Sequence, residues 1–520
     1  MGIYYLSDAL KWAASRASAK PRSIRLKMHE RAIDLMEESV FGEVNLAAIQ
    51  GPPGTGKTSV VEGFAERRLD ELVISKGLLI YIAPTNHLVF EAFRRMASIL
   101  LRKNYSLRDI IDCVRVYGSK IYPARKGGSV EINSEVLSYE DLRNLTSWLD
   151  LDRVKLVFAT EFQRIFAKLR ERIDEPVQMH VVADEASKTP FFRVFLPIAE
   201  KVVRDPRSYP ISLTVLGDPQ QAITVPEAMK AYRVPLLMKH VEKVLEEHGM
   251  RDECFLMLDT TFRLPGPSEV PISHGYYGGA LHALYRAGER LGMIEEAFID
   301  NRSVIERNLN RAGIDTQRNE VKALLNGLEE VLSAQSPLFT VRTKPFPSGD
   351  TYERERVWYA TIVSTALQEA SRLSEVSINT IVTAPYSDLV TSFSLRYKRL
   401  GSPLSNNPPL AVTVQSLVGG EGDVIVAMMG KEWGARRVSY YSPYYVPYEE
   451  DQETLYFREP EVFNVQSSRH RALYILIGDL PRLIRERNID PRLRKTVKKI
   501  IEMVEEDRFV IVDLTDGTLL

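Results

Sequence analysis

Eight residues near the start of the chain have the types and the spacing that bind phosphate. Gly51-Pro52-Pro53-Gly54-Thr55-Gly56-Lys57-Thr58 fits the pattern G-x-x-x-x-G-K-[ST], here called the P-loop. Its glycines let backbone N–H groups turn toward phosphate oxygens, Lys57 adds positive charge, and the Thr58 hydroxyl can ligate Mg²⁺. An apolar run (44–50) precedes the P-loop and a helical pattern (58–69) follows it. The pattern therefore predicts a site for the phosphates of a nucleotide and for Mg²⁺.

A pair of carboxylates later in the chain supplies the groups that a phosphate site still needs. Asp184 is the last residue of the short apolar run 179–184, which is predicted to be a buried strand, and Glu185 comes directly after it. A parallel sheet presents such residues at the carboxyl ends of its strands. Asp184 would hold Mg²⁺ through water, and Glu185 would position and deprotonate the attacking water. An isolated acidic pair is more often a pair of surface acids, so this interpretation depends on the preceding P-loop.

Short apolar runs alternate with longer amphipathic stretches, which is typical of α/β folds with parallel sheets. The runs before residue 250 are 44–50, 77–83, 154–160, 179–184 and 213–218, and those after it are 254–258, 378–385, 410–417, 424–429 and 472–478. The sequence therefore predicts two tandem, doubly wound α/β domains, residues 1–250 and 251–520. Residues 100–152 are predicted to be an insertion in the first domain, and residues 285–345 a helix-rich insertion in the second.

The composition is that of a globular protein, and it excludes several functional classes. Of 520 residues, 44% are hydrophobic and 26% are charged, and 68 Lys+Arg against 69 Asp+Glu leave a net charge of −1. This balance excludes a polybasic binder but allows a local cationic path for nucleic acid. Two cysteines are too few for a disulfide framework and suit an intracellular, cytoplasmic setting. No apolar run reaches the ~18 residues of a membrane span, so no membrane partner is expected.

Further short motifs follow in a definite order, and the ordered set resembles superfamily 1 helicases. The similarity is greatest to the branch that contains the nonsense-mediated-decay helicase, because residues 184–187 (DEAS) resemble the box of that branch. The other motifs are 83–86 (APTN), 158–160 (FAT), 216–221 (LGDPQQ), 262–265 (FRLP), 383–386 (TAPY), 413–423 (TVQSLVGGEGD) and 464–471 (NVQSSRHR). Individually most of these motifs are weak, whereas their order over residues 50–478 is specific.

The resemblance implies two RecA-like domains that hydrolyse ATP between them. The first domain would supply Lys57, Thr58, Asp184, Glu185 and Gln221, with Gln221 sensing the γ-phosphate. The second would supply the cations Arg263 and Arg469, Phe262 to stack on adenine, and Glu421 to accept from the ribose hydroxyl. His29 stands where the family has a glutamine that reads the adenine edge, and Lys188 stands where a glutamine usually follows the DEAS box.

The same resemblance implies a path for single-stranded DNA or RNA along the other edge of both domains. Phosphate contacts from backbone and small polar groups suit a motor that is indifferent to sequence. The candidate contacts are Pro84, Thr85, Asn86, Thr160, Pro385, Tyr386, Thr413 and Ser416. Their polar members are also typical helix N-caps, which is the alternative interpretation. Three basic clusters and one tyrosine-rich segment could line the same path or form ordinary surface. The clusters are residues 120–126, 396–399 and 494–499, and the tyrosine-rich segment is residues 434–457.

Two classes of function remain open from the sequence. The first is an ATP-driven translocase on single-stranded nucleic acid, a helicase in the usual sense, with protein partners reached through the insertions. The second is an ATP-gated clamp or scaffold that binds nucleic acid or a protein without unwinding. The departures at Val418, Gly420 and residues 466–468 motivate the clamp, because they alter motifs that couple hydrolysis to nucleic acid. A third hypothesis is a P-loop NTPase of another family. The motifs at residues 262–263 and 464–471 argue against it.

Overall fold

The computed structural model describes residues 3–17, 26–42, 44–74, 77–125, 130–132, 135–147, 153–163, 178–194, 211–222, 236–344, 351–400, 408–417, 420–430, 460–485 and 489–515. The chain divides into two compact units. The first unit comprises residues 1–51 and 56–258, and the second comprises residues 52–55 and 259–520. Four residues of the P-loop thus belong to the second unit, while its two ends belong to the first.

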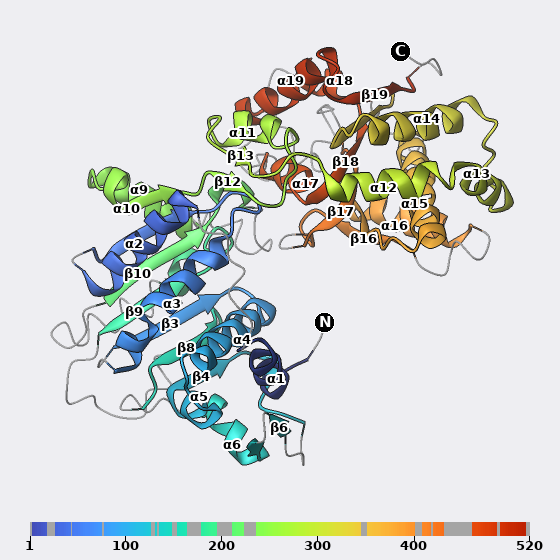
Figure 1. Ribbon diagram of the computed structural model, residues 1–520. Helices are drawn as coiled ribbons and strands as arrows, with labels where there is room; N and C mark the ends of the chain where they lie inside the picture. Colours follow the sequence, from blue (N-terminus) through green and yellow to red (C-terminus); the bar gives the residue numbers. More distant parts are fainter. Residues whose placement is uncertain are drawn as a thin grey trace. The chain divides into compact units, whose positions relative to one another are not determined.

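The first unit is built on a seven-stranded sheet with the order β11-β2-β10-β9-β3-β8-β4 (Figure 1). Every pairing in this sheet is parallel. Five of the strands are the apolar runs that the sequence analysis assigned to the first domain, so the predicted α/β class is confirmed. The elements are α1 (Leu6–Ala17), α2 (Lys27–Phe41), β2 (Leu46–Gln50), α3 (Lys57–Ile74), β3 (Leu78–Ala83), α4 (Asn86–Arg102), α5 (Leu107–Cys113), β4 (Val114–Tyr117), β8 (Leu156–Thr160), β9 (Met179–Ala183), β10 (Ile211–Gly217), α9 (Leu237–Glu247), α10 (Arg251–Cys254) and β11 (Phe255–Met257).

Strand β3 shows why helices cover both faces of this sheet. Successive side chains of a strand point to opposite faces. Leu79, Tyr81 and Ala83 therefore pack in the core beneath α1 to α4, and Ile80 and Ile82 pack in a second core with α9. All six residues of β3 are buried, which explains its continuous apolar run. Figure 1 shows α2, α3 and α4 side by side across one face.

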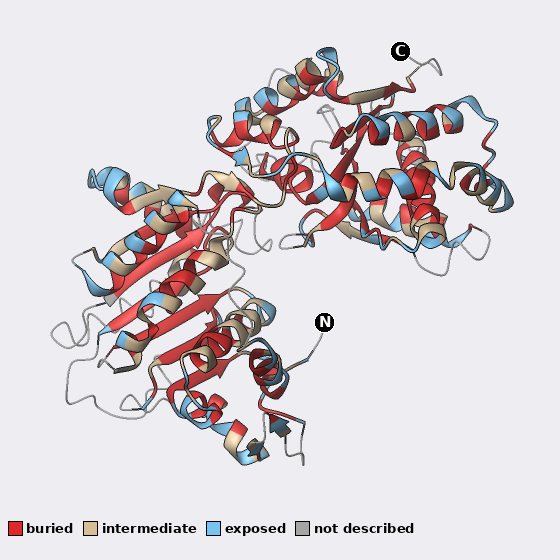
Figure 2. Ribbon diagram, in the orientation of Figure 1, coloured by how far each residue is buried: buried red, intermediate tan, exposed pale blue. Residues whose placement is uncertain are grey.

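The second unit contains a six-stranded sheet with the order β16-β15-β17-β18-β14-β19, again parallel throughout. Its central strands β17 and β18 are as buried as those of the first unit, whereas no residue of the edge strand β16 is buried (Figure 2). The elements are β12 (Thr260–Thr261), α11 (Val270–Tyr276), β13 (His282–Ala283), α12 (Glu289–Ile299), α13 (Arg302–Arg311), α14 (Asn319–Ser333), β14 (Leu338–Arg342), α15 (Thr351–Ser374), β15 (Thr380–Ala384), α16 (Ser387–Lys398), β16 (Leu410–Thr413), β17 (Gly422–Met428), α17 (Glu461–Ser467), β18 (His470–Gly478), α18 (Leu480–Arg485), α19 (Pro491–Glu505) and β19 (Val510–Asp513).

Three segments lie elsewhere than the sequence predicted. The run 254–258 was assigned to the second domain, but β11 pairs with β2 at the edge of the first sheet. Within the predicted insertion 100–152, β4 is the opposite edge strand of that sheet. Within the predicted insertion 285–345, β14 lies between β18 and β19 in the second sheet. Strand order is decided by tertiary pairing, so an apolar run does not reveal the sheet it joins.

Small elements flank the two sheets. They are the parallel pair β1 (Tyr4–Tyr5) and β5 (Ile121–Tyr122), the antiparallel hairpin β6 (Val130–Ile132) and β7 (Glu135–Leu137), helix α6 (Tyr139–Arg143), and the 3₁₀ turns η1 (Asn144–Thr146) and η3 (Pro219–Gln221). Among the helices of the described residues, none is long and apolar enough to span a membrane. The tyrosine-rich segment 434–457 lies outside the described residues.

Candidate nucleotide site

The P-loop connects β2 to α3 with the geometry that its sequence predicts. The first turn of α3 begins at Lys57, so the positive end of the helix dipole opens onto the loop. Gly54 and Gly56 have φ of 69° and 79°, a region that glycine enters without steric cost. The Lys57 ammonium donates to the Gly51 carbonyl at 2.9 Å, and the Gly51 N–H donates to the Gly217 carbonyl at 2.8 Å. The loop is therefore anchored to the end of β10.

Asp184 lies at the carboxyl end of β9, two strands from β2 in the sheet order β2-β10-β9. Its side chain is 6% exposed and accepts from the Tyr81 hydroxyl at 2.5 Å and from the Glu185 N–H at 2.8 Å. Burial raises the pKa of Asp184, the neighbouring Glu185 charge raises it further, and Tyr81 and Lys57 oppose the rise. The P-loop lysine and this carboxylate therefore interact electrostatically, which is expected if both belong to one phosphate site.

A tight turn after β9 presents Glu185. Its φ of 51° is left-handed, which a residue with a side chain adopts only where surrounding contacts hold it. The Ala186 N–H donates to the Leu216 carbonyl at 2.8 Å, and the Lys188 N–H donates to the Glu185 carbonyl at 2.9 Å. The Lys188 ammonium also lies 2.9 Å from Glu185 Oε2. Glu185 is thus held beside Asp184 with a cation of its own.

The strand between these two motifs ends in a small amide network. Asp218 follows β10 and is 1% exposed. Its carboxylate accepts from Gln50 Nε2 at 3.0 Å and from Gln221 Nε2 at 2.5 Å. Gln221, predicted to sense a γ-phosphate, is therefore 7% exposed and turned toward Asp218. The network fixes the ends of β2 and β10 relative to each other, and the sequence motif 216–221 contained only half of it.

In the second unit, the central residues of the P-loop contact the segment that follows β12. The Phe262 N–H donates to the Gly54 carbonyl at 2.9 Å. The space beside Gly54 is filled by the Cβ of Arg263 and by Thr261 Oγ1, which would lie 2.8 Å from an added Cβ. Arg263 and Phe262, predicted from the sequence to act on ATP, are therefore neighbours of the phosphate-binding loop.

The predicted cations of the second unit differ in their surroundings. Arg263 Nε lies 2.7 Å from Glu421 Oε2, and Arg471 pairs with the other oxygen of the same carboxylate. Glu421, predicted to bind a ribose hydroxyl, thus bridges two arginines. Arg469 is 3% exposed, whereas the Arg471 side chain is 54% exposed. Arg471 was not singled out by the sequence analysis, and its only signal was its position within residues 464–471. Arg290 holds Asp423 at 2.7 Å, which gives this motif acid a structural partner.

Oxygen donors at the edge of the first sheet fit Mg²⁺, which prefers carboxylate, hydroxyl and water ligands. The raised pKa of Asp184 marks a buried carboxylate whose charge its neighbours do not fully compensate. In the described part of the chain no group of three or more His, Cys, Asp and Glu residues could hold a metal alone. Thr58 and Asp184 would therefore hold Mg²⁺ together with water and the phosphates of the nucleotide, where the ion would neutralise phosphate charge.

The predicted adenine reader and the nucleic-acid candidates occupy positions that also serve the fold. His29 is 1% exposed on the buried face of α2, which leaves it no surface for a base. Thr85 caps α4 by accepting from the Leu88 N–H at 3.3 Å. The Thr413 and Ser416 hydroxyls lie 3.1 Å apart in one turn. The candidates at 84–86, 160, 385–386 and 413 all follow or end strands, at the edge where parallel sheets bind ligands.

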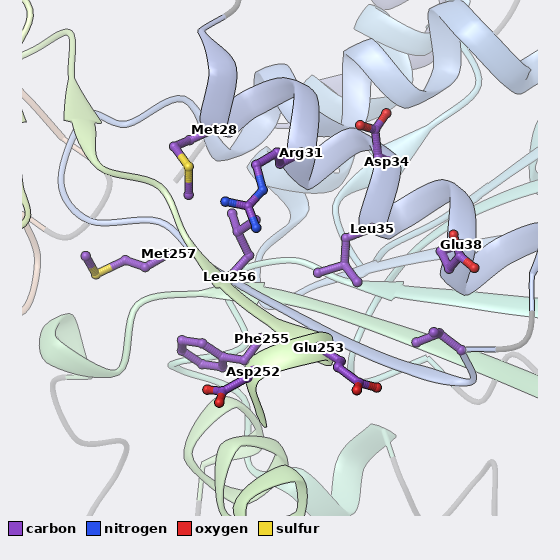
Figure 3. A pocket seen from close by; sticks show the side chains of 11 residues that line it. Met28, Arg31, Asp34, Leu35, Glu38, Asp252, Glu253, Phe255, Leu256 and Met257 are labelled. Atoms are coloured by element: carbon purple, nitrogen blue, oxygen red, sulfur yellow. The ribbon is translucent and has the colours of Figure 1, made fainter. Parts of the chain in front are cut away.

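A groove of about 520 Å³ lies in the first unit, away from these residues. Figure 3 shows α2 side chains, among them Arg31 and Leu35, on one side and residues 252–257 on the other. Its lining includes no P-loop residue and neither Asp184 nor Glu185. This groove is thus separate from the P-loop and from Asp184 and Glu185.

Comparisons with known proteins give a family match in the first half of the chain. Residues 28–178 match the family model described as an AAA domain, which includes the P-loop and ends before Asp184. No curated protein matches the sequence. The chain is similar to the helicase domain of Pyrococcus furiosus Hef, with 13% identity, 88% of this chain and 95% of that chain covered, and a TM-score of 0.32. It is also similar to S. cerevisiae Dbp5 bound to RNA and ADP BeF3, with 11% identity, 97% of this chain and 93% of that chain covered, and a TM-score of 0.32. For the DUF1998 helicase MrfA bound to DNA, the identity is 11%, 97% of this chain and 51% of that chain are covered, and the TM-score is 0.39. Likenesses this weak carry no argument about function.

Proposed function

We propose that the protein is an ATPase that moves along single-stranded DNA or RNA, with Mg²⁺ as its metal. The observation that carries the proposal is the convergence, at one edge of the first sheet, of the P-loop with the buried Asp184 and the strained Glu185. Lys57 would bind the β- and γ-phosphates, Thr58 and Asp184 would hold Mg²⁺, and Glu185 would orient and deprotonate water. The family match over residues 28–178 supports the nucleotide part of this proposal.

The nucleic-acid part rests on the ordered motifs and on the strand-end positions of their residues. Cations of the second unit, Arg263 and Arg469, are proposed to stabilise the charge that develops during hydrolysis. The superfamily 1 branch indicated by the DEAS box, and the roles of Phe262 and Glu421 toward adenine and ribose, stay predictions. His29 is not proposed further as an adenine reader, because it is buried.

One assay tests the function most directly. ATP hydrolysis is measured with Mg²⁺ alone and then with single-stranded DNA and single-stranded RNA in parallel. We expect hydrolysis to rise with at least one nucleic acid. Lys57→Ala should abolish it together with ATP binding, whereas Glu185→Gln should abolish hydrolysis without loss of ATP binding. Hydrolysis that no nucleic acid changes would contradict a translocase. Arg469→Ala should bind ATP but hydrolyse it slowly, and a variant with unchanged turnover would remove Arg469 from the proposal.

A second candidate function is an ATP-gated clamp that binds nucleic acid or a protein without unwinding. The departures at Val418, Gly420 and residues 466–468 motivate it, because they alter the motifs that would couple hydrolysis to nucleic acid. Strand displacement on a tailed duplex distinguishes the two functions. Stimulated hydrolysis with displacement supports the translocase, and stimulated hydrolysis without displacement supports the clamp.

A further inference from the structure

Three charged side chains, Asp184, Glu185 and Lys188, follow the carboxyl end of β9, and the P-loop lysine Lys57 acts on the first of them. Lys57 is near enough to Asp184 to lower its pKa, and the adjacent Glu185 raises that pKa. Lys188 Nζ lies 2.9 Å from Glu185 Oε2. Two carboxylates are therefore flanked by two lysines. The first lysine is the one that a P-loop directs at the β- and γ-phosphates, and the second stands where the resembling family usually has an uncharged glutamine.

The pairing of Lys188 with Glu185 is imposed by the backbone. The turn from Asp184 to Lys188 is closed by the Lys188 N–H to Glu185 carbonyl bond of 2.9 Å. It also packs closely on β10, where an added Cβ at Gly217 would lie 2.8 Å from the Ser187 nitrogen. Both charged side chains are about one-fifth exposed, at 22% and 21%. A surface pair of long side chains is worth little, whereas this pair is short, shielded and held by a fixed turn.

We propose that Lys188 is a positioning residue that responds to the γ-phosphate, exchanging its ion pair with Glu185 for one with the terminal phosphate of ATP. The inference rests on the proposed nucleotide site. A terminal phosphate carries more negative charge and more acceptor oxygens than one carboxylate, so it competes for the ammonium. ADP lacks that phosphate, and Lys188 then stays with Glu185. The exchange makes Lys188 a determinant of ATP over ADP and releases Glu185 from Lys188 only when a triphosphate is bound.

Equilibrium binding separates this role from a structural one. A fluorescent, non-hydrolysable ATP analogue and the matching ADP are titrated with Mg²⁺ into the wild type, Lys188→Ala, Glu185→Gln and the double variant. We expect Lys188→Ala to weaken binding of the ATP analogue by about tenfold, the scale of one charge-assisted hydrogen bond. Its affinity for ADP should change less than about twofold. Glu185→Gln should bind the ATP analogue more tightly than wild type, because the competing carboxylate is gone, and this gain should vanish without Lys188.

Two further variants control the experiment. Lys188→Arg keeps the charge and should keep the preference for ATP. Lys103→Ala removes a comparable ion pair, 2.5 Å from Asp70, between α4 and α3, and should leave both affinities unchanged. Equal loss of ATP and ADP binding in Lys188→Ala, or no loss, would refute the γ-phosphate role. A gain in Glu185→Gln that persists without Lys188 would refute the exchange. A folded wild type that binds neither nucleotide would instead refute the proposed function itself.

Discussion

Gly54 is the P-loop position at which a single methyl group should do the most damage. Its φ of 69° costs a residue with a Cβ about 1–2 kcal/mol. The added Cβ would also overlap the Cβ of Arg263, which cannot rotate away because its own backbone fixes it, and would crowd Thr261 Oγ1 at 2.8 Å. Overpacking of this kind costs a further ~1–3 kcal/mol. Gly54→Ala should therefore lower the free energy of unfolding by roughly 2–5 kcal/mol, as the sum of those two costs.

The chain offers a matched control for this substitution. Gly249 has the same φ of 69°, but nothing lies within 4 Å of a Cβ built there. Gly249→Ala should therefore cost only the backbone term of about 1–2 kcal/mol. Urea unfolding measures both variants, and titration with an ATP analogue measures the site. We expect nucleotide affinity to fall at least tenfold in Gly54→Ala, because the loop N–H groups must move, and to stay unchanged in Gly249→Ala. Equal stabilities and unchanged binding in both variants would show that Arg263 does not restrain the loop.

Three further predictions concern buried charge. The pKa of Asp184 is raised by burial and by Glu185, so the ionised carboxylate costs the folded state more as pH rises above the unfolded pKa of 3.8. Asp184→Asn should therefore raise the free energy of unfolding near pH 8 and not near pH 3. An equal rise at both pH values would contradict this prediction. The pKa of His470 is lowered to about 3 by burial and by Arg263, so stability should fall as pH drops below 6.5, and less in His470→Gln, in urea titrations at stepped pH. Arg356 is fully buried and donates to three backbone carbonyls and one hydroxyl; Arg356→Met should cost more than about 3 kcal/mol, at ~1–3 kcal/mol per stranded acceptor, and a loss under 1 kcal/mol would contradict it.

The prediction from sequence was most successful where a short stretch of chain determines its own geometry. The P-loop is such a stretch, because its glycines, lysine and following helix are all local. The buried parallel strands were likewise visible, since strands covered on both faces are apolar throughout. The position of Asp184 at a strand end followed from the same pattern.

Contacts between distant segments were beyond the reach of the sequence. Tyr81 donates to Asp184 across 103 positions, and Arg263 meets Glu421 across 158. Neither pairing leaves a trace in the spacing of residues, because each depends on which strands become neighbours. For the same reason the run 254–258 was assigned to the wrong sheet, and His29 was expected at a base although it faces the core.

The amino-acid sequence by itself determined the chemistry that this protein can offer: a phosphate-binding loop, a pair of acids after a buried strand, and a row of motifs in one order. Only the tertiary structure decided which charges lie side by side. It paired Lys188 with Glu185 and brought Lys57 near enough to Asp184 to lower the pKa of that carboxylate. The physical reason is that parallel strands bring their carboxyl ends to one edge of the sheet, so residues far apart in the chain meet at that edge.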